Sequence, residues 1–66
     1  MTLREFKANL EEFIKLNPES LDLEVITSMD DEGNAFNRVY YTPSKGEYSD
    51  REFDAKSTIV NAVCIN

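Results

Sequence analysis

An acidic block with the sequence Asp-Asp-Glu-Gly-Asn, at residues 30–34, separates two apolar runs near the middle of the chain. The apolar runs cover residues 23–26 and 39–41. Asp and Asn side chains bond to nearby backbone amides, and glycine adopts a positive φ without steric cost, so the block predicts a turn. We therefore expect two neighbouring strands joined by a solvent-exposed bend.

The same part of the chain concentrates negative charge. Six carboxylates lie between Pro18 and Phe36 without any Lys or Arg among them, namely Glu19, Asp22, Glu24, Asp30, Asp31 and Glu32. The whole chain has a net charge of −6, which repels nucleic-acid phosphate and anionic lipid. Direct binding to nucleic acid or to a membrane is therefore not expected. A basic protein surface is the natural electrostatic partner, although such a charge also simply favours solubility.

The length of 66 residues predicts a single domain over residues 1–66, in the size range where one hydrophobic core is marginal. One Cys and no His leave neither an intrachain disulfide nor the usual zinc ligands to add stability. A bound partner would add it, and so would a homodimer. The sequence contains no stretch as long as a membrane span and no secretory signal pattern, and a single Cys64 suits a reducing compartment, so we expect a cytoplasmic protein.

The N-terminal segment predicts an amphipathic helix from about Thr2 to Leu16. Thr2 and Glu5 have the spacing of a capping box. Asn17 precedes a proline and therefore avoids helical geometry, which ends the helix. Apolar side chains recur along one helical face, at Leu3, Phe6, Leu10, Phe13 and Ile14.

Residues 21–26 and 36–41 predict two strands that pair across the acidic bend, because both segments are rich in β-branched, aromatic or alternating apolar residues. Residues 42–46 contain Pro and Gly placed for a tight turn.

Two further segments follow in the C-terminal third. Residues 47–53 predict a short peripheral strand, for which a capped helical turn at residues 49–52 is the alternative. Residues 58–65 are apolar on both faces apart from Asn61, which predicts an interior strand.

These segments together predict an α+β fold, with one N-terminal amphipathic helix packed on a small, mainly antiparallel sheet of three to four strands. The apolar face of the helix is expected to form a single core with Leu23, Val25, Val39, Val60 and Ala62.

The residue inventory argues against an enzyme. The chain has no His to act as a base near neutral pH, and Cys64 has no evident activating partner. A calcium loop needs Gly at its sixth position and Glu at its twelfth. Counting from Ser28 places Gly33 sixth but leaves Val39 twelfth. We therefore expect no metal and no cofactor, and keep a small-ligand or cation binder as an alternative.

The order of these segments resembles that of small acidic proteins of unassigned function encoded by phages and prophages. The shared features are an opening amphipathic helix, a strand that runs into an acidic Gly-Asn turn, an aromatic second strand and a last strand with Ala-Val. The matching pieces are residues 6–16, 23–28, 30–34, 39–41 and 61–63. The resemblance implies a phage origin and the host cytoplasm, and it implies no activity.

The leading expectation is a non-enzymatic accessory protein that binds a host or phage protein. Tyrosine is enriched at interfaces, and the acidic bend lies next to aromatic residues. The candidate contact residues are Asp30, Asp31, Glu32, Phe36, Arg38 and Tyr40. The alternative is an inhibitor that mimics nucleic acid and blocks a host or defence nuclease or a DNA-binding protein, because carboxylates on a rigid scaffold compete for a site shaped to a phosphate backbone.

Overall fold

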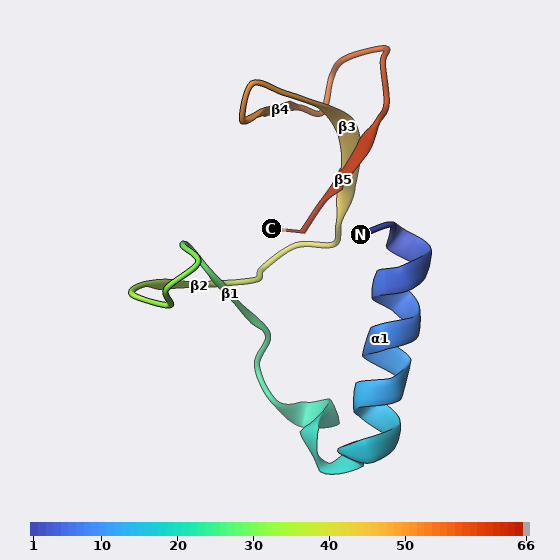
Figure 1. Cartoon of the computed structure of the whole chain (residues 1–66), viewed down its shortest axis with the longest axis vertical. Coiled ribbons are helices and arrows are strands. Elements are labelled where there is room, and N and C mark those ends of the chain that lie inside the picture. The colour runs from blue at the N-terminus through green and yellow to red at the C-terminus, as the bar shows by residue number, and fades with distance from the viewer. Residues whose placement is uncertain (66) are drawn as a thin grey trace.

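The computed structural model describes residues 1–65 and contains, in that range, one α-helix, one 3-10 helix and five strands (Figure 1). In chain order the elements are α1 (Leu3–Leu16), η1 (Pro18–Asp22), β1 (Ile26–Ser28), β2 (Phe36–Arg38), β3 (Ser44–Ser49), β4 (Glu52–Asp54) and β5 (Ala62–Cys64). Every pairing is antiparallel. The predicted α+β class is confirmed, with the strands divided between a two-stranded sheet, β1-β2, and a three-stranded sheet, β4-β3-β5.

Helix α1 begins and ends where the sequence predicts. The Thr2 hydroxyl oxygen accepts a hydrogen bond from the Glu5 backbone amide at 3.1 Å, which satisfies one of the free amides of the first turn. At the other end, the Asn17 backbone amide donates to the Phe13 carbonyl at 2.8 Å, and the Asn17 side chain donates to the same oxygen at 3.1 Å. Pro18 then starts η1, where a missing amide proton costs no hydrogen bond.

Strands β1 and β2 form the hairpin expected around the acidic block, but both are shorter than predicted. A hydrogen bond from the Val39 amide to the Val25 carbonyl at 3.1 Å continues the pairing beyond the strand ends. The prediction of a strand from residue 21 onward is wrong for most of that segment. Pro18 fixes a helical φ at the start of η1, and η1 extends to Asp22.

Strand β3 is the central strand of the three-stranded sheet, and each of its two halves pairs with a different strand. Its second half pairs with β4, where Tyr48 lies opposite Phe53. Its first half pairs with β5, where Lys45 lies opposite Val63. The prediction of an interior strand at residues 58–65 is therefore wrong, because β5 is at an edge of the sheet.

Gly46 determines how the chain crosses this sheet. Among residues 1–65 it is the only buried residue. A Cβ atom at this position would lie 2.9 Å from Ala55 Cα and 2.9 Å from Phe53 Cζ, and closer still to the Asp54 carbonyl oxygen. The predicted tight turn at residues 42–46 is therefore misplaced: this glycine belongs to β3 and allows the chain after β4 to pass close over the strand.

Asn61, which directly precedes β5, is hydrogen-bonded to the central strand β3 at two residues. Its side-chain oxygen accepts a hydrogen bond from the Tyr48 amide at 2.7 Å, and its side-chain nitrogen donates to the Tyr48 carbonyl at 3.2 Å. Its own backbone amide donates to the Gly46 carbonyl at 3.0 Å. The side-chain amide therefore takes the place of one more backbone pair and lengthens the contact between β5 and β3.

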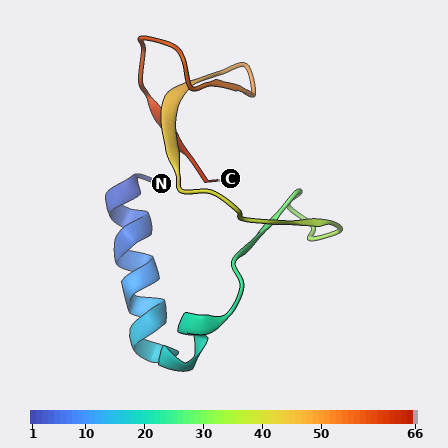
Figure 2. The ribbon, with the colours of Figure 1, turned by 180° about the vertical axis from the view of Figure 1, so that it is seen from behind.

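The predicted hydrophobic core is not formed, since no hydrophobic side chain in residues 1–65 is buried. Figures 1 and 2 show α1, the β1-β2 hairpin and the three-stranded sheet as three arms of an open arch. Extended contacts between elements occur within each sheet and between α1 and η1. With strands of three residues, except for the six of β3, neither sheet offers an apolar face wide enough to cover the helix.

Candidate functional site

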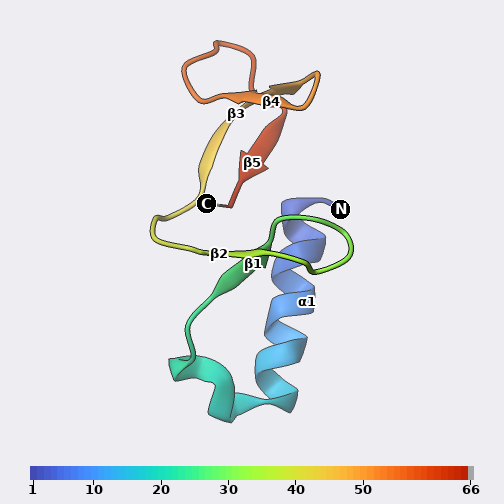
Figure 3. The ribbon, with the colours of Figure 1, turned by 90° about the vertical axis from the view of Figure 1, so that its left-hand side faces the viewer.

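The β1-β2 hairpin carries all six residues that the sequence suggests for partner contact. Figure 3 shows it in front of α1 and below the three-stranded sheet, and Figure 1 shows that it extends away from both. The six residues lie on the acidic turn, on β2 or just beyond the end of β2, at Asp30, Asp31, Glu32, Phe36, Arg38 and Tyr40.

Asp30 builds the turn. Its Oδ1 accepts hydrogen bonds from the backbone amides of Glu32 at 3.1 Å and Asn34 at 3.0 Å, and its carbonyl accepts one from the Ser28 hydroxyl. Gly33 completes the turn with a φ of 72°. Hydrogen bonds to the carboxylate, first among them that of the Asn34 amide, hold the pKa of Asp30 below its ordinary value, because they favour the charged form. The Asp30 carboxylate therefore serves the hairpin itself.

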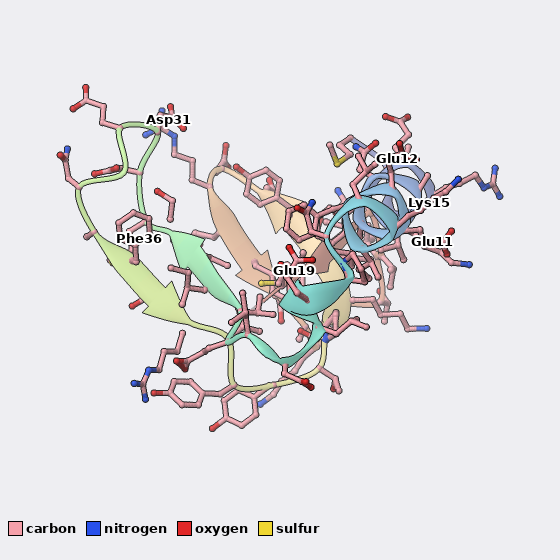
Figure 4. All side chains as sticks on the ribbon, turned by 90° about the horizontal axis from the view of Figure 1, so that it is seen from below. Glu11, Glu12, Lys15, Glu19, Asp31 and Phe36 are labelled. Carbon is pink, nitrogen blue, oxygen red and sulfur yellow. The ribbon has the colours of Figure 1, made fainter. Side chains whose placement is uncertain are left out.

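Asp31 and Glu32 supply the outward charge of the turn. Asp31 lies at the tip of the hairpin (Figure 4) and is exposed. Glu32 is exposed as well, and one of its carboxylate oxygens accepts a hydrogen bond from the Asn34 side chain at 3.2 Å. Both carboxylates are exposed to solvent, while the Asp30 carboxylate is bonded to the backbone of the turn that carries them.

The aromatic side chains of this arm are largely exposed. Phe36 is 56% exposed, and Tyr40 and Tyr41 are 71% and 74% exposed. The two tyrosine rings lie beside each other, with centroids 6.3 Å apart and planes tilted by 53°. The sequence predicts opposite faces of one strand for these two residues. That prediction is wrong, because β2 ends at Arg38 and the strand alternation stops there.

Arg38 is engaged within the arm. Its Nε lies 3.0 Å from Glu24 Oε2, and both side chains are more than half exposed. An exposed pair of this kind contributes little to stability. The pair matters for the charge of the arm. Arg38 is the one basic residue of the arm, and it is paired with Glu24, which lies outside the turn. The negative charge of the turn is therefore not neutralised.

A second surface feature was missed by the sequence analysis. An apolar hollow of about 640 Å³ lies between the start of α1 and β5. Its lining includes Met1, Leu3, Phe6, Val60, Val63 and Ile65. The first three of these belong to the helical start, but their placement beside β5 depends on the long-range path of the chain, which no local pattern reveals.

The described residues offer few groups for chemistry. Within residues 1–65, no three His, Cys, Asp or Glu side chains converge where they could hold a metal ion. No helix in that range has the length and apolar character needed to cross a membrane. Comparison with protein-family profiles, curated proteins and solved structures finds no match to the chain.

Proposed function

We propose that the protein is a non-enzymatic binding protein that recognises a basic surface of another protein through its β1-β2 hairpin. The observation that carries this proposal is the combination on one projecting arm of an acidic tip and exposed aromatic rings. Aromatic residues are the commonest energetic anchors of protein interfaces, and complementary charge steers the partners together.

Charge is distributed unevenly along the chain in a way that supports this role. The segment from residue 18 to residue 41 contains six carboxylates and one basic residue, Arg38, whereas α1 contains three acidic and three basic residues. A basic partner is therefore attracted to the hairpin and not to the helix. Such attraction acts mainly on the association rate and weakens with added salt.

The residues of the arm divide into two roles. Asp30 is a positioning residue, because its carboxylate is bonded to the backbone of the turn. Asp31 and Glu32 meet the basic groups of the partner, and Phe36 and Tyr40 supply the apolar contact. The phage-type resemblance of the sequence makes a host or phage protein the natural partner class.

The experiment is a capture of partners from host lysate at low salt with the full chain immobilised. We expect one or more basic proteins to bind, and the double variant Asp31→Lys/Glu32→Lys to lose them. Phe36→Ala should weaken the same complex by at least tenfold, as an anchor residue does. The matched control is Glu12→Lys, which changes charge on the outward face of α1 and should retain binding.

Failure to recover a partner, or a partner that binds the charge-reversed variant equally well, would overturn the proposal. If the captured protein binds nucleic acid and the two ligands compete, the hairpin acts by mimicking a phosphate backbone, which is the alternative raised by the sequence.

A further inference from the structure

The apolar stripe of α1 is open to solvent along its whole length. Ile14 of this face is half-buried, and the other large side chains on it and at its end are between 37% and 69% exposed, at Leu3, Phe6, Leu10, Phe13 and Leu16. In Figure 4, the labelled side chains of Glu11, Glu12 and Lys15 lie on the side of α1 away from the hairpin. The stripe, on the opposite side of the helix, therefore faces the inner side of the arch.

The area of the chain indicates how much surface a partner has to cover. A folded monomer of this mass exposes about 4,300 Å², whereas this chain exposes 6236 Å². The excess is about 1,900 Å², and a stable interface of ordinary size needs about 800 Å² from each partner. The radius of gyration agrees, at 13.8 Å against about 11 Å for a compact domain of this length. One copy of a second chain, at an interface of ordinary size, would cover about 40% of this excess.

The order of residues along the stripe is symmetric about the middle of the helix. Leu3 and Leu16 stand at its two ends, and Phe6 and Phe13 stand three residues in from each end. An interface on a two-fold axis requires one patch that is complementary to itself. Turning the helix end for end places Leu3 on Leu16 and Phe6 on Phe13, so these two pairs meet that requirement in the antiparallel orientation.

The charges of the molecule favour the same arrangement. The first half of α1 carries Arg4, Glu5 and Lys7 and is net positive, whereas the second half carries Glu11, Glu12 and Lys15 and is net negative. Antiparallel helices bring unlike halves together. The hairpin arms are both acidic and repel each other, which excludes them from the contact between copies.

We infer that the protein is a homodimer in which the α1 stripes of two copies pack antiparallel across a two-fold axis. Phe13 and Leu16 of each copy then reach the apolar hollow beside Met1 and Val63 of the other copy. The acidic tips of the hairpins take no part in this contact. The inference goes beyond the binding role of the hairpin and does not depend on it.

The first test is the mass of the full chain in solution by sedimentation equilibrium. We expect twice the chain mass of 7.6 kDa. A Lys in the centre of the stripe, as in Leu10→Lys, should yield the single-chain mass, because it places a charge on the two-fold axis. The matched control Glu52→Lys, on the exposed strand β4 away from the stripe, should remain dimeric. A single-chain mass for the unaltered protein, or a dimer that tolerates Leu10→Lys, would overturn the inference and leave the stripe to a different protein.

The second test measures orientation and does not need a disruptive variant. In a Cys64→Ser background, Leu3→Cys chains and Leu16→Cys chains are oxidised separately and as a mixture. The antiparallel packing predicts disulfide-linked dimers mainly in the mixture, whereas efficient self-linking of Leu3→Cys alone would contradict it. The hairpin variant Asp31→Lys/Glu32→Lys should keep the dimer mass, so a failure of partner binding and a failure of dimerisation are distinguishable.

Discussion

The two hairpins of the molecule reach the same antiparallel pairing by different means. The β1-β2 turn is held by its own side chains, with Asp30 bonded to two backbone amides and a glycine at the position of positive φ. The β3-β4 turn has neither device. Its two central residues, Asp50 and Arg51, have φ angles of 51° and 65°, which costs a non-glycine residue about 1 to 2 kcal/mol.

The difference shows where the stability of each hairpin originates. The first is a local structure, specified by five consecutive residues of suitable turn chemistry. The second is held from outside by the close crossing at Gly46 and by the Asn61 side chain on Tyr48. A hydrogen bond of 2.9 Å from the Ser57 hydroxyl to Glu47 adds to this external support. A hairpin can therefore keep an unfavourable turn when distant residues close the sheet around it.

The largest effect is expected from Gly46→Ala, which disrupts the close crossing of the chain over β3 at Gly46. The added methyl group would meet the backbone of Asp54 and Ala55, and backbone cannot move aside as a flexible side chain can. We expect a loss of about 3 kcal/mol in the free energy of unfolding, at the upper end of overpacking effects. Urea denaturation of the full chain, with amide exchange of β3, measures it.

The matched control is Gly33→Ala in the first hairpin. Its new methyl group would lie 3.6 Å from the Phe36 ring, an ordinary contact, so only the positive φ opposes it. That strain costs about 1 kcal/mol. Equal losses for the two variants would mean that the crossing at Gly46 is not what holds the second sheet.

A stabilising effect of intermediate size is expected from Arg51→Gly. Glycine adopts the positive φ of 65° without strain, so the free energy of unfolding should rise by about 1 kcal/mol. Arg51→Ala separates this cause from loss of the side chain, because alanine retains the Cβ atom and should change stability by only a few tenths of a kcal/mol. Thermal unfolding of both variants gives the comparison. A stabilisation by alanine as large as that by glycine would contradict the strain argument.

The smallest effect is a pH dependence confined to the first hairpin. The folded state lowers the pKa of Asp30, so the ionised carboxylate favours the folded turn. This contribution is complete above the ordinary carboxyl pKa and is lost as the pH falls through the lowered value. Amide exchange of Glu32 and Asn34 across that acid range should report the loss. Asp30→Asn keeps a neutral acceptor oxygen and should lack this pH dependence. An unchanged profile in the variant would assign the effect to another group.

Sequence reasoning was accurate where the determinants are local. The limits of α1 follow from Thr2 and from Asn17 before a proline, and the bend at residues 30–34 follows from its own composition. These features depend on contacts within about four residues, which a single sequence reveals. The class of fold could be predicted for the same reason.

The prediction failed where distant segments decide the outcome. Gly46 was assigned to a turn because glycine commonly marks one, while its actual requirement is the nearby backbone of Ala55. The role of Asn61 depends on Tyr48, 13 residues away. A helix with one apolar face predicted a core, but the sequence cannot tell whether that face meets its own sheet or a second chain. Of the candidate site, the acidic tip and its aromatic neighbours could be located from the sequence. The sequence did not reveal that Asp30, unlike Asp31 and Glu32, uses its carboxylate to hold the backbone of the turn.

The Asn61 side chain affects how the edge of β3 can pair with other chains. An open strand edge offers free amide and carbonyl groups to any extended segment that passes, and this is a common route to fibrils. On β3, the Asn61 side chain occupies both the amide and the carbonyl of Tyr48. An incoming strand therefore cannot form backbone hydrogen bonds to Tyr48. A single asparagine thereby closes the part of the β3 edge that β5 does not cover.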